Sequence, residues 1–147
     1  MRIFLDANIF VAAAGSLEGG SRYLFQIAQK EHWTLVTSFY ALREARANIE
    51  RKLPASVSVF STLVTHPALM VTAEAPHQLQ QLCAAVLPEK DVPILASALF
   101  ARCAFLCTLD RRDFHLERVQ SFCRRYRMVV VTPKDVLVRY RRASHGG

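Results

Sequence analysis

Short apolar runs alternate along the chain with longer stretches in which apolar residues recur at helical spacing. The short runs are rich in β-branched and aromatic residues, which predicts strands at residues 2–5, 34–37, 69–72, 105–109 and 128–132. The stretches between them predict helices over residues 21–30, 38–52, 54–65, 76–87, 91–102, 115–126 and 133–142. Because helical crossovers join parallel strands, we expect an α/β fold in which helices cover both faces of a mainly parallel five-stranded sheet.

The length of 147 residues suits one domain with a substantial core, and no linker divides the chain. We expect a single domain over residues 1–142 and a flexible tail over residues 143–147. No run approaches the roughly 20 apolar residues of a membrane-spanning helix. Asp6 and Asn8 interrupt the apolar segment that a signal peptide would need. These features predict a soluble cytoplasmic protein.

The four cysteines all lie in apolar or helical stretches, and none forms a C-x-x-C pair. Free cysteine is among the most buried residue types, so we expect reduced, buried thiols. A zinc site would need the short ligand spacing that is typical of such sites. The candidate ligands lack that spacing; they are Cys103, Cys107, His115 and Cys123.

The formal net charge of +7 arises in the last third of the chain. Residues 1–100 carry eight basic and eight acidic groups, whereas residues 101–147 carry eleven basic and four acidic groups. Most of the excess is arginine, whose forked guanidinium suits phosphate contacts, but an acidic protein partner would explain the charge equally well. The candidate nucleic-acid-binding residues, for which the family resemblance given below implies RNA, are Arg111, Arg112, Arg124, Arg125 and Arg127.

Four of the five aspartates stand where a predicted strand ends or a predicted helix begins. The carboxyl ends of parallel strands meet at one edge of a sheet, which is where open α/β folds build their sites. Each aspartate alone is also explained as a turn or helix-cap residue. Together, such close carboxylates resist common ionisation unless a cation neutralises them. They are Asp6, Asp91, Asp110 and Asp113.

Two further observations concern the predicted helices. Asp91 shares the apolar face of its helix with Leu95 and Leu99, where an unpaired charge would be costly, although an N-cap role remains an alternative. Glu44 lies at the boundary between the apolar stripe of its helix and solvent, and boundary glutamates are common. A cation held by such oxygens should be hard, which favours Mg²⁺ or Mn²⁺.

The order of these motifs resembles the PIN domain, in particular the VapC-type toxins of toxin–antitoxin pairs. The resemblance covers nearly the whole chain: LDANIF, the helix TSFYALREARANI, DVPILASALFARCAFLCTLDRRDF and VVVTPKDVL follow one another in the family's order. It implies a three-layer α/β/α sandwich and a Mg²⁺- or Mn²⁺-dependent ribonuclease. The acids implied as catalytic are Asp6, Glu44, Asp91 and Asp110, with Asp113 as an additional or alternative metal ligand and Asn8 and Thr108 as polar residues of the pocket.

One departure from the family pattern affects Asp113. Many relatives place the last acid two residues after its predecessor, whereas Arg111 and Arg112 both separate Asp110 from Asp113 here. Asp113 is therefore the least secure of the metal ligands Asp6, Asp91, Asp110 and Asp113.

The resemblance also implies a homodimer and a cognate antitoxin that silences the nuclease. The apolar segments SRYLFQIAQ and PASVSVFSTLV offer faces for a dimer, although a monomer core would explain the same residues. A non-catalytic PIN module that binds RNA or protein is the alternative function. The sequence has no signature of a serine esterase, P-loop NTPase, zinc peptidase or dinucleotide enzyme. It also lacks the aspartates that a phosphoacceptor receiver domain would need between Asp6 and Asp91.

Overall fold

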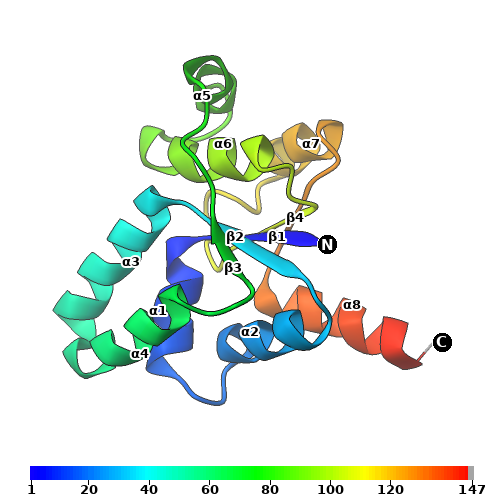
Figure 1. Cartoon of the computed structure of the whole chain (residues 1–147). Coiled ribbons are helices and arrows are strands. Elements are labelled where there is room, and N and C mark those ends of the chain that lie inside the picture. Colours follow the sequence, from blue (N-terminus) through cyan, green and yellow to red (C-terminus); the bar gives the residue numbers. More distant parts are fainter. Residues whose placement is uncertain (146–147) are drawn as a thin grey trace.

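The computed structural model describes residues 1–145 of the chain. These residues form one five-stranded parallel sheet (Figure 1). The strand order is β3-β2-β1-β4-β5, and all four strand pairs are parallel. This confirms the predicted α/β fold and its parallel sheet. The strands are β1 (Arg2–Leu5), β2 (Thr34–Thr37), β3 (Leu69–Val71), β4 (Phe105–Cys107) and β5 (Val129–Val131).

Helices cover both faces of the sheet and complete the three layers (Figure 1). On one face lie α5 (His77–Ala84), α6 (Val92–Phe100) and α7 (Glu117–Arg125). On the other face lie α1 (Ala7–Gly15), α2 (Gly20–Lys30), α4 (Val57–Val64) and α8 (Pro133–His145). The helix α3 (Phe39–Lys52) contributes to the cores on both faces, and short 3₁₀ turns at Pro54–Ser56 (η1) and Glu89–Asp91 (η2) precede α4 and α6.

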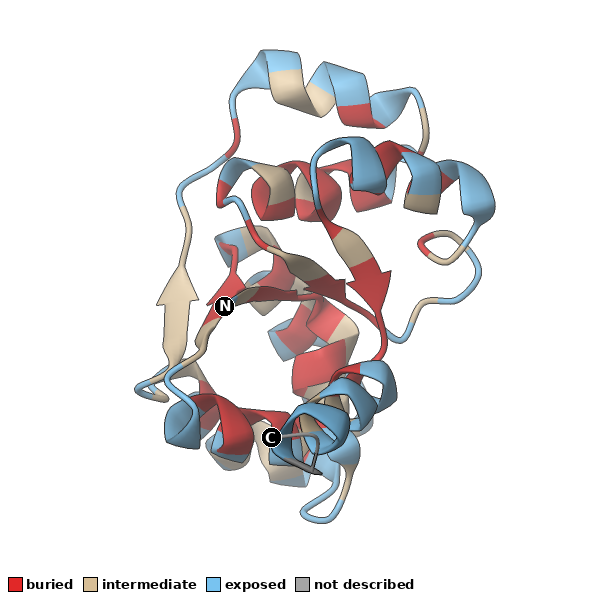
Figure 2. Cartoon of the chain, turned by 90° about the vertical axis from the view of Figure 1, so that its right-hand side faces the viewer, coloured by how far each residue is buried: buried red, intermediate tan, exposed pale blue. Residues whose placement is uncertain are grey.

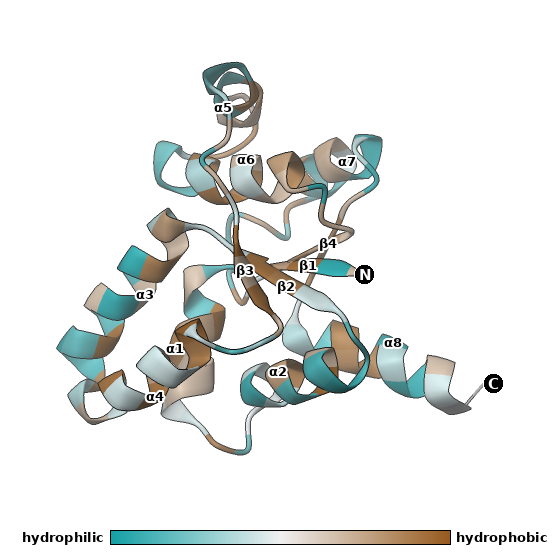
Figure 3. Ribbon diagram, in the orientation of Figure 1, coloured by the Kyte–Doolittle hydropathy of each residue, from teal (hydrophilic) through white to brown (hydrophobic). Residues whose placement is uncertain are grey.

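The apolar core has two parts, one on each side of the sheet. Successive side chains of a strand point to opposite faces, so Phe4 packs toward α6 and α7, whereas Ile3 and Leu5 pack toward α1 and α2. All three side chains are fully buried. Most residues of β1, β2, β4 and β5 are buried and apolar, the edge strand β3 is half-buried, and the outer faces of the helices are exposed and more polar (Figures 2 and 3). This is the pattern that the apolar runs predicted for a sheet covered on both faces.

The sequence analysis missed the first helix, α1. Its sequence, ANIFVAAAG, is apolar along nearly its whole length, so it shows no polar stripe at helical spacing. The helix lies against the sheet, α2, α3 and α4, and Ile9, Phe10 and Ala13 are fully buried. Periodicity fails for a helix of this kind because core surrounds it on several sides. The structure therefore adds α1 immediately after the aspartate that ends β1.

The end of the chain differs from the predicted domain boundary at residue 142. Helix α8 continues through His145, so three residues of the predicted tail are helical, and residues 146–147 lie outside the described part of the chain. No helix within the described residues is long and apolar enough to cross a membrane.

The cysteine prediction is confirmed, because all four cysteines are free and buried. Burial raises the pKa of Cys83 and Cys103 to about 12, so these thiols are protonated at neutral pH. Among the described residues, the one group of side chains that could share a metal is made of aspartates and includes no cysteine.

The two segments that were expected to offer a dimer face contribute to the monomer core instead. Leu24, Phe25 and Ala28 of α2 are buried in the core on the α1 side of the sheet, as are Phe60 and Leu63 of α4. These residues are therefore no evidence for a dimer, and the homodimer remains a prediction.

Candidate active site

The expected acidic residues meet at the carboxyl edge of the sheet. Strand β1 pairs in parallel with β4, so the residues that follow Leu5 and Cys107 lie side by side. The backbone N–H of Asp6 donates a hydrogen bond of 3.1 Å to the carbonyl of Cys107. This pairing brings Asp6 together with the loop that begins at Thr108, although about a hundred residues separate them in the sequence.

Asp6 is held by three hydrogen bonds in the metal-free protein. Its Oδ1 accepts from the backbone N–H of Ala7 at 2.7 Å, which caps α1, and its Oδ2 accepts from the Thr108 hydroxyl at 2.7 Å and from Asn8 Nδ2 at 3.4 Å. Burial raises the pKa of Asp6 to about 6, the bonds from Thr108 and Ala7 oppose this rise, and the charge of Glu44 adds to it. Asp6 therefore caps a helix and also belongs to the site.

Asn8 and Thr108 connect the loops after β1 and β4. Asn8 Nδ2 lies 3.2 Å from the Thr108 hydroxyl, and Asn8 Oδ1 accepts a bond of 3.1 Å from the backbone N–H of Leu109. The Thr108 hydroxyl also accepts from the backbone N–H of Asp110 at 3.0 Å. These two polar residues thus fix the positions of Asp6 and Asp110 relative to each other.

Asp91 immediately precedes α6, but its side chain makes no capping hydrogen bond. The residue is only 9% exposed, and its Oδ2 atom is buried without a hydrogen-bond partner among the described residues. Burial raises the pKa of Asp91 to about 7, and Asp113 and Asp110 contribute further increases. The N-cap alternative for Asp91 is therefore wrong: its carboxyl group points toward other carboxyl groups.

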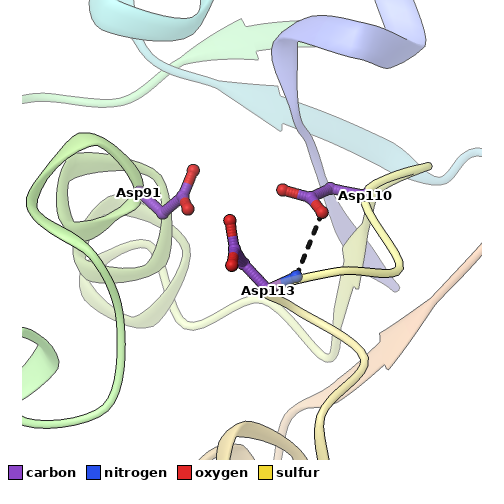
Figure 4. A group of neighbouring side chains, drawn as sticks. All are labelled: Asp91, Asp110 and Asp113. Atoms are coloured by element: carbon purple, nitrogen blue, oxygen red, sulfur yellow. Dashed lines mark hydrogen bonds between the residues drawn. The ribbon is translucent and has the colours of Figure 1, made fainter.

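A tight turn after β4 returns Asp113 to the site. Asp110 Oδ1 accepts hydrogen bonds from the backbone N–H groups of Arg112 at 3.0 Å and Asp113 at 3.1 Å, one of which Figure 4 shows. As a result, one oxygen each from Asp91, Asp110 and Asp113 lies within 4.8 Å of the other two. The extra residue between the last two acids does not remove Asp113, because the backbone turn compensates for it.

Glu44 reaches the same place from α3. A cavity of about 670 Å³ opens between α1, α3 and the loop after β4, and Glu44, Asp6 and Asp110 all contribute to its lining. Asp91 and Asn8 line it as well. The structure therefore brings Asp6, Glu44, Asp91 and Asp110 into one pocket, and Asp113 joins Asp91 and Asp110 from beside it.

The residues present fit a divalent cation. Three carboxylates converge on one point, and the buried Asp91 Oδ2 atom has no partner within the described chain. An ionised oxygen in that position is costly unless a positive charge meets it. An all-oxygen donor set favours Mg²⁺ or Mn²⁺ over softer metals.

Sequence analysis missed Lys90, which belongs to this pocket, and Tyr40, which contacts Lys90 from outside it. Lys90 lines the cavity, and its ammonium group lies 3.6 Å from Asp113 Oδ2. The Tyr40 hydroxyl donates a hydrogen bond of 2.8 Å to the Lys90 carbonyl, which ties α3 to the turn that carries Asp91. The position of Lys90 directly before Asp91 was the only signal in the sequence.

The candidate RNA-binding arginines divide between two places. Arg111 and Arg112 lie in the turn beside Asp110. The others end α7 or follow it, just before β5 begins, and so lie toward the opposite edge of the sheet. Arg124 pairs with Glu117 there, and Arg125 lies over the Phe122 ring with its guanidinium carbon 5.5 Å from the ring centre. RNA binding by Arg111, Arg112, Arg124, Arg125 and Arg127 remains a prediction.

Comparison with known proteins establishes the family. The PIN domain profile matches residues 3–137, which is most of the chain. The chain belongs to the PIN domain family. A search among curated proteins finds no match.

The fold of this PIN domain is similar to two solved structures, one of a VapBC complex and one of a VapC toxin. One is the Rickettsia felis VapBC2 complex bound to a DNA fragment of its promoter, with a TM-score of 0.68 at 14% identity over 90% of this chain and 98% of the other. The other is Mycobacterium tuberculosis VapC20, a toxin that cleaves the sarcin–ricin loop, with a TM-score of 0.55 at 11% identity over 77% of this chain and 93% of the other. At these identities the likeness concerns the fold.

Proposed function

We propose that this PIN domain is an endoribonuclease that hydrolyses phosphodiester bonds of single-stranded or structured RNA with Mg²⁺ or Mn²⁺. The observation that carries the proposal is the convergence of Asp91, Asp110 and Asp113, together with the Asp91 Oδ2 atom that is buried without a hydrogen-bond partner among the described residues. A helix cap would have satisfied that oxygen, whereas a divalent cation shared by the three carboxylates would account for it.

The acidic side chains have two proposed roles, cation binding and proton transfer. Asp91, Asp110 and Asp113 would hold the cation, with Asp6 beside them. When bound, the cation supplies Lewis acidity and neutralises charge on the phosphate. Glu44 lies half-buried in the pocket, beside the Tyr40 hydroxyl and outside the aspartate trio, so its carboxylate is placed to accept the proton of the attacking water. Thr108 and Asn8 keep Asp6 oriented toward the pocket.

We further infer that the chain is the toxin of a type II toxin–antitoxin pair. Support comes from its family and from the two solved structures whose fold it shares. An antitoxin that covers the pocket would have to neutralise its carboxylates, so a basic segment is the expected contact. Co-purification with the product of an adjacent short gene, and loss of ribonuclease activity in that complex, would test this assignment.

The decisive experiment is cleavage of single-stranded RNA by the purified chain with Mg²⁺, with Mn²⁺ and with EDTA. Asp91→Asn and Asp110→Asn should abolish cleavage. Asp135→Asn is the matched control, because Asp135 is an exposed residue of α8 that accepts a hydrogen bond from the backbone N–H of Thr132. RNA binding without cleavage in every metal condition would favour the non-catalytic module instead.

A further inference from the structure

A second cavity lies beside the acidic pocket, between α3, α5 and α6. Its volume is about 290 Å³, near the lower limit of small-molecule sites, and its lining includes Phe39, Tyr40, Arg43, Thr72 and Ser97. We propose that this cavity binds one unpaired nucleobase of the RNA, next to the nucleotide whose phosphate lies on the acids. This inference rests on the proposed nuclease function and adds to it a site for substrate selection.

The aromatic residues of the cavity suit a base. Phe39 is the first residue of α3, and its side chain is 75% exposed, an unusual position for a large apolar ring. Tyr40, the next residue, is half-buried in the lining. Unstacked bases of single-stranded RNA bind by stacking on such rings, and this contact is available to any base.

The deeper part of the cavity offers hydrogen bonds for the edge of a base. Ser97 of α6 is only 4% exposed and brings its hydroxyl group to the lining of the cavity. The Ser38 side-chain oxygen accepts from the backbone N–H of Ala41 at 3.2 Å, which leaves its hydroxyl hydrogen available to donate. A small cavity with an aromatic ring outside and hydroxyl groups inside matches a planar, polar-edged ligand.

The position of the cavity fits a nucleotide that neighbours the cleavage point. Tyr40 lines this cavity and Glu44 lines the acidic pocket, and the two residues stand one turn apart on the same face of α3, about 6 Å between Cβ atoms. A stacked nucleotide step covers about 3.4 Å, and an unstacked step covers more. A strand whose phosphate lies on the acids therefore reaches the cavity with its next base, and Arg43 on the rim is placed to contact the backbone phosphate.

RNA accounts for the cavity better than a protein partner does. A docking protein segment anchors a large apolar side chain in a desolvated pocket, and hydroxyl groups in the lining that such a side chain cannot bond weaken the anchor. The exocyclic groups of a base would satisfy the same hydroxyl groups. Protein docking is therefore the competing outcome of the test.

The test measures the affinity of a fluorescently labelled single-stranded RNA in the Glu44→Gln background with Mg²⁺, which removes the proposed proton acceptor but keeps the aspartate trio, so that binding is read without cleavage. Adding Phe39→Ala should weaken RNA binding about 5- to 150-fold, the effect of losing one base–aromatic stack. Phe39→Trp keeps an aromatic ring at this position and should bind RNA as tightly as the chain with Phe39. Phe100→Ala is the matched control, because Phe100 is a 42% exposed phenylalanine at the other end of α6. An RNA with one abasic position should bind the chain with Phe39 more weakly by the same factor. The abasic position should make no difference to binding by the Phe39→Ala variant.

The outcomes separate the two proposals. Unchanged RNA affinity in Phe39→Ala, or an equal loss in Phe100→Ala, would overturn the base site while metal-dependent cleavage by the wild-type chain left the nuclease intact. Phe39-dependent RNA binding in a chain that never cleaves would refute the nuclease and keep the base site. If Phe39→Ala left RNA binding unchanged but released a co-encoded antitoxin, the cavity would be a protein contact and the base site would be refuted.

Discussion

Replacing Asp91 with asparagine should stabilise the metal-free protein while it abolishes cleavage. Burial and the neighbouring aspartates raise the pKa of Asp91 to about 7, against 3.8 for a free side chain. In the unfolded chain the group loses its proton near pH 4, whereas in the folded chain it keeps the proton up to about pH 7. Stability therefore falls as the pH rises between these values, because the unfolded state binds fewer protons there.

The structure sets the size of the effect. Each unit of pKa shift corresponds to about 1.4 kcal/mol, so the whole shift would amount to roughly 4 kcal/mol. Asp113 lies against Asp91 and accounts for part of this shift, so we assign about 2 kcal/mol to Asp91 alone. Asparagine has nearly the same shape, cannot ionise, and offers an N–H to the neighbouring carboxylates. At pH 8 in EDTA, Asp91→Asn should therefore melt about 4–8 °C above the wild type, and below pH 4 the difference should disappear.

Thermal unfolding at several pH values, with EDTA and with Mg²⁺, measures this directly. Mg²⁺ should raise the melting temperature of the wild type and have little effect on Asp91→Asn, because ligand binding stabilises only the chain that binds it. Asp135→Asn should respond to Mg²⁺ as the wild type does. The reasoning would be refuted if Asp91→Asn lost stability equally at pH 4 and pH 8, since a structural role that is independent of charge would then be the explanation.

Three further predictions concern Thr108, the arginines beside the acids, and the oligomeric state. Thr108→Val removes the hydroxyl bond of 2.7 Å to Asp6, so the free energy of unfolding should fall by about 1–3 kcal/mol. Because this bond lowers the pKa of Asp6, the acidic limb of the pH–rate profile should move to higher pH. An unchanged profile would contradict this role of Thr108. Arg112→Gln beside the acids should reduce the slope of log RNA affinity against log salt concentration by about 0.7. Arg127→Gln should leave this slope unchanged for a short RNA that covers only the acidic edge of the sheet. Equal slopes for the wild type and both variants would count against the electrostatic contact. Light scattering at micromolar concentration tests the homodimer, for which twice the mass of 16.6 kDa is expected.

The sequence predicts the sheet well because its signals are local. Apolar runs of β-branched residues identify all five strands, and helical crossovers determine that the strands are parallel. Helix α1 escaped notice because a helix buried on several sides carries no polar stripe. The convergence of Asp6 with Asp110 was also predictable, because parallel strands end at the same edge and acids follow two of them.

Features that depend on side-chain direction were harder to predict. An aspartate before a helix is usually a cap, so only the structure distinguishes Asp6, which caps α1, from Asp91, which makes no cap bond. The extra residue between Asp110 and Asp113 seemed to place Asp113 away from the site. The turn that brings Asp113 back depends on two hydrogen bonds from backbone N–H groups to Asp110 Oδ1, which the sequence does not reveal. The charge excess of the last third suggested one basic surface, but the elements that carry the arginines end toward opposite edges of the sheet.

The way each acid is satisfied shows how the site tolerates its own charge. Asp6 and Asp110 accept hydrogen bonds from backbone N–H groups, and Asp6 also accepts one from Thr108. Asp113 has the Lys90 ammonium group nearby. Among these acids, Asp91 has a buried oxygen without a partner within the described residues, and protonation relieves it only below about pH 7. The charge of Asp91 is therefore the one that the chain compensates least, so replacing Asp91 should weaken cation binding more than replacing Asp6 does.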